Sequence, residues 1–88
     1  MVINFKTEAL IDWEYWKKYG TKTEQKKITA LLQNIRENPF RGTGKPELLK
    51  YDLSGKWSRR INKEHRIVYS VDGDLITVYS LRGHYSTK

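Results

Sequence analysis

The stretch from residue 66 to residue 81 reads Arg66-Ile67-Val68-Tyr69-Ser70-Val71, then Asp72-Gly73-Asp74, then Leu75-Ile76-Thr77-Val78-Tyr79-Ser80-Leu81. β-Branched and aromatic residues dominate both of its ends, which is typical of strands. The Asp-Gly-Asp segment between them predicts a hairpin turn. Just upstream, residues 57–61 alternate weakly between apolar and polar, and residues 62–64 read as a turn. We therefore expect three consecutive antiparallel strands in this half of the chain.

A short strand and a first helix are predicted at the start of the chain. Residues 2–5 are apolar and β-branched enough to form the strand. Thr7 is a capping residue type, so we expect it to cap a helix that runs to about residue 19 and is closed by Gly20. The apolar stripe of this helix, at helical spacing, consists of Ala9, Trp13 and Trp16.

A second helix follows directly. Thr21 and Glu24 have the spacing of a capping box, which predicts a helix start, and Asn38-Pro39 predicts its end after about residue 37. Its apolar stripe consists of Ile28, Leu31, Leu32 and Ile35. Two helices joined by so short a link predict a helical hairpin.

The order strand, helix, helix, antiparallel run predicts an α+β fold in which two N-terminal helices pack on one face of a twisted antiparallel sheet. The other face of the sheet would be free to hold a ligand. Residues 40–56, rich in Gly and Lys, predict short turns with a brief strand at 47–50. With 88 residues, the chain is expected to form a single domain, 1–88.

Composition narrows the classes of function. Lys and Arg number 17 against 10 Asp and Glu, which gives a net charge of +7 and points to a polyanionic partner. Cysteine is absent, which excludes disulfides, thiolate nucleophiles and Cys-built zinc sites. No secretory signal is seen, and no apolar run approaches the about 20 residues that span a bilayer. We expect a soluble cytoplasmic protein.

The C-terminal half concentrates side chains that could carry chemistry: Glu47, Lys50, Arg59, Arg60, His65, Arg66, Arg82, His84 and Tyr85. Because strand side chains alternate between faces, Arg59 and Arg60 cannot both face the core. Cleavage of RNA by its own 2′-hydroxyl needs a base such as Glu, an acid such as His, and Arg to stabilise charge on phosphorus, without a metal. From residue types alone, plain nucleic-acid binding is favoured over RNA cleavage. Another interpretation is that these side chains are ordinary solvated surface residues.

Four motifs follow one another along the chain: NPFRGTGKPELLK at 38–50, LSGKWSRRI at 53–61, EHRIVY at 64–69, and the terminal pair His84-Tyr85. Together they resemble the Txe/YoeB family of the RelE/ParE superfamily. The similarity covers residues 1–85 in one colinear pass. The chain departs from the family pattern at Gly83, where a bulkier residue is usual, and at residues 86–88, which follow the His-Tyr pair.

The resemblance implies a toxin of a type II toxin–antitoxin system that enters the ribosomal A site and cuts mRNA there. It implies a RelE-like fold, an inhibitory cognate antitoxin, a homodimer, and no metal or other cofactor. A non-catalytic toxin of the same fold, like the gyrase inhibitors of the ParE branch, and a plain RNA-binding module are the alternatives. The Glu, Arg and His-Tyr set argues against the ParE branch.

The resemblance also implies roles for particular residues. Glu47 would be the general base on the 2′-hydroxyl, Arg66 would stabilise the pentacoordinate phosphate, and His84 would be the general acid on the 5′-oxygen. Tyr85 would position the scissile group. The expected RNA contacts are Lys50, Arg59 and Arg60.

Overall fold

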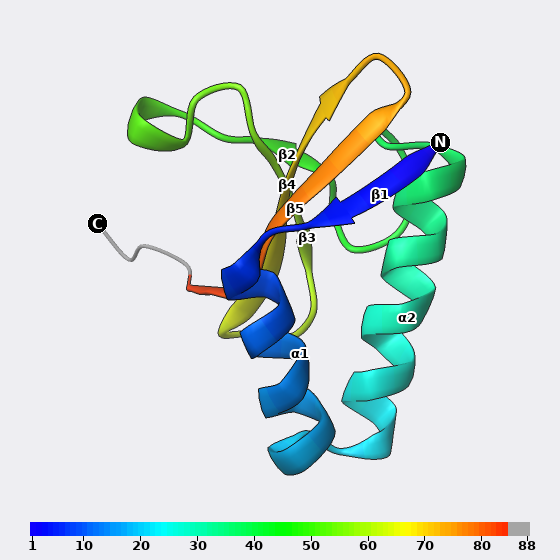
Figure 1. Cartoon of the computed structure of the whole chain (residues 1–88), viewed down its shortest axis with the longest axis vertical. Coiled ribbons are helices and arrows are strands. Elements are labelled where there is room, and N and C mark those ends of the chain that lie inside the picture. Colours follow the sequence, from blue (N-terminus) through cyan, green and yellow to red (C-terminus); the bar gives the residue numbers. More distant parts are fainter. Residues whose placement is uncertain (85–88) are drawn as a thin grey trace.

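The computed structural model describes the backbone of residues 1–84 and the side chains of residues 1–83. Its elements are β1 (Val2–Phe5), α1 (Thr7–Tyr19), α2 (Lys22–Glu37), β2 (Glu47–Leu48), a one-turn 3₁₀ helix η1 (Tyr51–Leu53), β3 (Trp57–Arg60), β4 (His65–Asp72) and β5 (Leu75–His84). Figure 1 shows the helical hairpin of α1 and α2 packed beside the twisted sheet. The α+β fold is as predicted.

The sheet is mixed, with the strand order β1-β5-β4-β3-β2. Strands β2 to β5 form the predicted antiparallel run, whereas β1 pairs in parallel with β5. Backbone hydrogen bonds from Val2 to Asp74 and from Lys6 to Val78, each 2.9 Å, mark the two ends of that parallel pairing. The first strand thus joins the sheet beside the last one, a long-range contact that local sequence patterns do not carry.

The start of α1 differs from its prediction. Thr7 is the first helical residue and not the cap; the cap position is Lys6, whose side chain makes no capping hydrogen bond. Because the Lys6 N–H is bonded to the Val78 carbonyl, the strand pairing continues to the helix without a turn in which Thr7 could act as cap.

The end of α1 and the start of α2 lie where they were predicted. Gly20 follows α1 with extended backbone (φ −78°), and a Cβ there would lie 2.7 Å from a ring carbon of Trp16, so close packing is what requires glycine. The capping box of α2 is present: the Glu24 N–H donates to Thr21 Oγ1 and the Thr21 N–H donates to Glu24 Oε1, both at 3.0 Å. The Thr21 backbone hydrogen bond to the Glu24 carboxylate lowers the pKa of that carboxyl.

The core lies between the helices and one face of the sheet. The predicted stripes supply Ala9, Trp16, Ile28, Leu31 and Ile35, all buried, while Trp13 and Leu32 are half-buried at its margin. Ile61, which directly follows β3, and residues of β4 and β5 complete the core; the strand residues are Ile67, Tyr69, Ile76, Val78 and Leu81. In the described part of the chain, neither helix is long and apolar enough to cross a membrane.

Asp12 is a buried carboxylate in the apolar stripe of α1, which the sequence pattern did not predict. Its Oδ2 accepts the backbone N–H groups of Leu81 (2.9 Å) and Arg82 (3.1 Å). One turn further along α1, Trp16 Nε1 donates to the Leu81 carbonyl at 2.8 Å. The two side chains together satisfy backbone groups near the end of β5, close to a place where bulges shift its pairing with β4.

We predict that Asp12→Ala lowers the free energy of unfolding by about 2–3 kcal/mol, because one buried and one part-buried N–H group lose a charged acceptor. Asp12→Asn keeps an acceptor oxygen and should cost about half as much. The measurement is urea denaturation followed by tryptophan fluorescence. Glu14→Gln, which removes only an exposed ion pair with Lys17, is the matched control and should stay within about 0.5 kcal/mol. Equal losses for Asp12→Ala and Glu14→Gln would contradict the role of Asp12.

Candidate active site

The face of the sheet that does not contact the helices carries three of the predicted site residues. Strand pairing sets Glu47 opposite Ser58 and Ser58 opposite Val68, and it sets Arg60 opposite Arg66. Directly opposed residues of antiparallel strands point to the same face. The side chains of Glu47, Arg60 and Arg66 therefore share this face, which we call the open face. Glu47 and Arg66 stand two strands apart, about 10 Å across the sheet.

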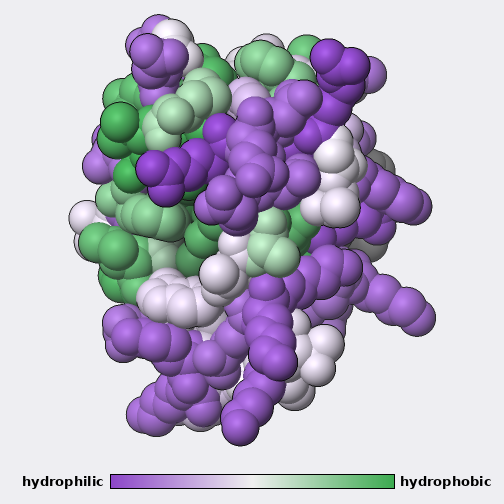
Figure 2. Space-filling view, turned by 90° about the vertical axis from the view of Figure 1, so that its right-hand side faces the viewer, coloured by the Kyte–Doolittle hydropathy of each residue, from purple (hydrophilic) through white to green (hydrophobic). Residues whose placement is uncertain are grey.

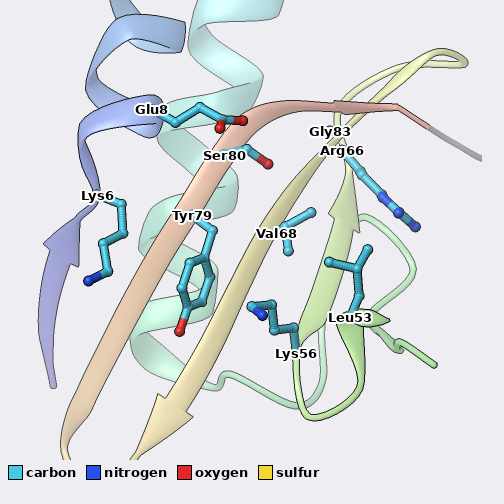
Figure 3. A pocket seen from close by; sticks show the side chains of 9 residues that line it. All are labelled: Lys6, Glu8, Leu53, Lys56, Arg66, Val68, Tyr79, Ser80 and Gly83. Atoms are coloured by element: carbon cyan, nitrogen blue, oxygen red, sulfur yellow. The ribbon is translucent and has the colours of Figure 1, made fainter. Parts of the chain in front are cut away.

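A cavity of about 460 Å³ lies on the open face. Figure 3 shows Lys6 and Glu8 on one side of it and Lys56 and Arg66 on the other. The residues that line it are Lys6, Glu8, Leu53, Lys56, Arg66, Val68, Tyr79, Ser80 and Gly83. Three cations against one carboxylate make it a place where a phosphate would be attracted.

A bulge in β5 shapes the cavity wall. Val78 pairs with Tyr69 and Ser80 pairs with Val68, so Tyr79 is one residue more than the partner strand supplies. The extra residue allows the neighbours Tyr79 and Ser80 both to line the cavity, which strict alternation would forbid. The Tyr79 hydroxyl lies 2.9 Å from Ser70 Oγ, and Lys56 Nζ lies 4.7 Å from the centre of the Tyr79 ring. The aromatic ring is thus held from two sides.

The structure gives a steric reason for glycine at position 83. Gly83 pairs with Arg66, and a Cβ added to it would lie 2.9 Å from Val68 Cγ2 and 3.3 Å from Arg66 Cγ. Close packing against Val68, Ser80 and Arg66 therefore favours glycine at this position of the paired strand.

Glu47 and Lys50 lie at the margin of the open face. Both are exposed, Glu47 in the edge strand β2 and Lys50 immediately before η1. His84 ends β5, where its Cα is opposite that of His65. Its side chain, and all of Tyr85 and residues 86–88, lie outside what the structure describes.

Arg59 is not available to RNA, which corrects its prediction as an RNA contact. Its side chain is 0% exposed and faces α2 and the loop after it. Its guanidinium donates five hydrogen bonds, and the acceptors are Tyr69 Oη, Asn34 Oδ1 and the carbonyls of Asn38, Arg41 and Thr43. As alternation requires, the neighbouring Arg60 is exposed. Arg59 is therefore a structural residue.

Tyr69 extends the Arg59 network. Its hydroxyl accepts from Arg59 Nε at 3.1 Å and donates to the Pro39 carbonyl at 2.6 Å. Burial raises the pKa of the Tyr69 phenol, and the hydrogen bond and charge of Arg59 oppose that shift. The phenol therefore remains protonated and able to donate. The network holds residues 38–43, the loop that leads to Glu47.

Sequence reasoning missed the cavity residues Lys6, Glu8, Lys56, Tyr79 and Ser80. Regular alternation along a strand at residues 75–81 would put Tyr79 and Ser80 on opposite faces, and no local signal marks a bulge. Lys6 and Glu8 reach the cavity only because β1 pairs with β5, which no pattern near the N-terminus indicates.

A second hollow, of about 180 Å³, lies among Phe5, Leu10, Trp13, Leu32 and Leu81. Its lining has no titratable side chain, so it offers nothing for acid–base chemistry.

Figure 2, a view from the side of α2, shows apolar side chains gathered on part of the surface and hydrophilic side chains over the rest. Within the described residues, no three His, Asp or Glu side chains are grouped as a metal site would require.

Comparison with known proteins identifies similar chains. A family model for YoeB-like toxins of bacterial type II toxin–antitoxin systems matches residues 5–85. Toxin YoeB of Escherichia coli K12 is 45% identical over 85 residues, covering 97% of this chain and 100% of that protein. Two Staphylococcus aureus structures, each 44% identical and covering 97% of this chain and 98% of the other, superpose well: a heterotetrameric YoeB–YefM toxin–antitoxin complex (TM-score 0.83) and a YoeB dimer (TM-score 0.86).

We predict that Arg59→Met destabilises the fold by about 3 kcal/mol or more, because buried carbonyls and the Tyr69 hydroxyl lose their donor. Arg60→Met removes the neighbouring exposed arginine and should change the free energy of unfolding by at most about 0.5 kcal/mol. Urea denaturation of both variants checks this pair. Similar losses for the two would contradict the assignment of Arg59 as the structural arginine.

Proposed function

Because the chain belongs to the YoeB-like toxins of bacterial type II toxin–antitoxin systems, we propose that it is an endoribonuclease that cuts mRNA in the ribosomal A site and so stops translation. The observation that carries the proposal is the shared open face. A carboxylate, Glu47, and two guanidinium groups, Arg60 and Arg66, lie on it beside a cationic cavity.

In the proposed reaction, the Glu47 carboxylate takes the proton of the 2′-hydroxyl, and the 2′-oxygen attacks the adjacent phosphorus. The bond to the 5′-oxygen breaks as His84 protonates that oxygen. The products are a 2′,3′-cyclic phosphate and a 5′-hydroxyl, so protons and electrons balance without an outside reactant. Arg66 stabilises the additional negative charge on the pentacoordinate phosphate. Tyr85 positions the scissile group.

The pairing of Arg60 with Arg66 supports a phosphate site. Guanidinium groups on two directly opposed strand positions can both donate hydrogen bonds to one phosphate. Lys50, exposed at the entrance to η1, and Lys56 in the cavity wall extend the cationic path along the RNA backbone.

The proposed partners follow from the relatives. The Staphylococcus aureus structures are a YoeB–YefM complex and a YoeB dimer. We propose that this chain likewise has a cognate antitoxin, which covers the open face, and that it forms a homodimer when free. Its ribosomal substrate places its action in the cytoplasm.

We predict that Glu47→Gln, Arg66→Ala and His84→Gln each relieve growth arrest and slow cleavage of ribosome-bound mRNA about 10²- to 10⁴-fold without unfolding the chain. Each variant removes one proton-transfer or charge-stabilising group. Mapping new 5′ ends on the mRNA measures cleavage, and thermal denaturation confirms folding. Glu37→Gln, an exposed carboxylate at the end of α2, is the matched control and should remain toxic. Full toxicity of all three site variants would refute the site.

A second prediction concerns the nucleophile. An mRNA whose cleaved nucleotide carries hydrogen in place of the 2′-hydroxyl should resist the enzyme, because the attacking oxygen is missing. Cleavage products of normal mRNA should end in a 2′,3′-cyclic phosphate or a 3′-phosphate. Cutting of the 2′-deoxy substrate at the normal rate would show that water is the nucleophile. No new ends with wild type, together with DNA damage in cells, would show a gyrase inhibitor instead.

A further inference from the structure

Tyr51 combines two unusual properties. Its side chain is 90% exposed, and its backbone lies in the left-handed region with φ 61°. Left-handed backbone is unfavourable for residues with a Cβ, and it is least tolerated by bulky ones. Burial does not repay that strain here, since almost all of the ring is in water. Strained residues that the surrounding structure holds in place cluster at ligand-binding sites.

The loop around Tyr51 is built to hold this conformation. The Leu49 N–H donates to the Lys56 carbonyl at 2.8 Å and closes the base of the loop. Within it, the Ser54 N–H donates to the Tyr51 carbonyl (2.9 Å) and the Leu53 N–H donates to the Lys50 carbonyl (3.2 Å). The ring is therefore presented on an ordered turn.

The loop also borders the cavity. Leu53 and Lys56, from the same turn as Tyr51, line the cavity together with Arg66. Figure 1 shows the segment that contains η1 projecting from the sheet, away from α2. Lys50, the residue before Tyr51, is exposed and cationic. An exposed ring next to a cation, at the margin of a phosphate-binding cavity, is the arrangement that single-stranded RNA binders use to stack a base.

We propose that Tyr51 stacks on one unpaired base of the RNA next to the cleaved linkage and so helps to select and hold the substrate. This inference rests on the proposed function and adds a base-binding residue to it. The ring supplies a flat apolar surface of about the area of a base, while Lys50 contacts the phosphate on one side of that base. Stacking tolerates all four bases, so Tyr51 contributes affinity and register more than sequence choice.

The first test compares Tyr51→Phe, Tyr51→Ala and Tyr51→Gly in cleavage of ribosome-bound mRNA. Tyr51→Phe keeps the ring and should behave like wild type. Tyr51→Ala and Tyr51→Gly should raise KM about 5- to 100-fold with kcat changed little. Tyr19→Ala removes another exposed tyrosine (66%), at the tip of the helical hairpin, and should leave KM unchanged. Equal KM values for wild type and Tyr51→Ala overturn the proposal.

Stability separates a functional role from a structural one. Glycine accepts positive φ, so Tyr51→Gly should be at least as stable as wild type while binding RNA more weakly. Lys45→Gly, which relieves the same kind of strain at φ 52°, is the matched control for thermal denaturation. A fall in Tm of several degrees for Tyr51→Gly, with RNA affinity unchanged, would show that Tyr51 serves the fold alone.

The second test removes bases from the RNA one at a time. Abasic nucleotides are placed at each position flanking the cleaved linkage. Wild type should lose about tenfold in affinity at one position, and Tyr51→Ala should show no further loss at that same position, since the stacking partner is already gone. Identical penalties in the two proteins at every position would overturn the stacking assignment.

Affinity is measured in parallel on uncleavable 2′-deoxy mRNA, which separates this inference from the proposed function. Absence of cleavage by wild type, with Tyr51-dependent RNA affinity intact, refutes the nuclease and supports the base contact. Cleavage by wild type with affinity independent of Tyr51 supports the nuclease and refutes the base contact. Loss of the dimer in Tyr51→Ala by analytical ultracentrifugation, with RNA affinity unchanged, assigns the ring to a protein contact and also overturns the proposal.

Discussion

The guanidinium of Arg59 joins α2, the loop after it and β3 through one set of hydrogen bonds, and the placement of Glu47 depends on it. All five of its acceptors are neutral oxygens, three of them backbone carbonyls of the loop. A buried cation is tolerated only when every donor has an acceptor. Other conformations of the loop would remove its carbonyls from Arg59 and leave a buried charge without hydrogen bonds, so few of them are accessible. β2 has two residues and could not hold its place by pairing alone.

Asp12 performs the corresponding task on the other side of the open face. Its carboxylate and the Trp16 indole bind the backbone at Leu81 and Arg82, just before the strand reaches Gly83 and His84. The two proposed proton-transfer residues thus lie on segments that are each fastened by a buried polar side chain, Arg59 from β3 and Asp12 from α1. The small apolar core holds the helices and the sheet together, and these hydrogen bonds fix the positions of the groups that are proposed to transfer protons.

Much of the fold could be predicted because its signals are local. The capping box at Thr21 and Glu24, the stripe around Ile28 and the Asp72-Gly73-Asp74 turn each involve residues within a few positions of one another. Alternation likewise predicted that Arg59 and Arg60 do not both face the core. It could not say which of them does, because that depends on which face of β3 meets α2. The parallel pairing of β1, the bulge at Tyr79 and the burial of Asp12 share this property: each is decided by a partner distant in sequence. For the same reason, residue types predicted Glu47 and Arg66 as site candidates, while Lys6 and Glu8 were missed.

Departures from local rules are concentrated on one side of the molecule. On the helical side, capping, apolar stripes and satisfied polar groups agree with one another. Around the open face, Arg60 opposes Arg66, Tyr79 is an extra residue in its strand, and Tyr51 holds a left-handed backbone in water. Under the proposed function, a phosphate and a base of the RNA would occupy this face. Local inconsistency of this kind is expected where a protein has been shaped by a ligand and not by its own stability. A partner that covers the open face, as proposed for the antitoxin, would occupy the same strained groups, so inhibition and stabilisation would arise from one set of contacts.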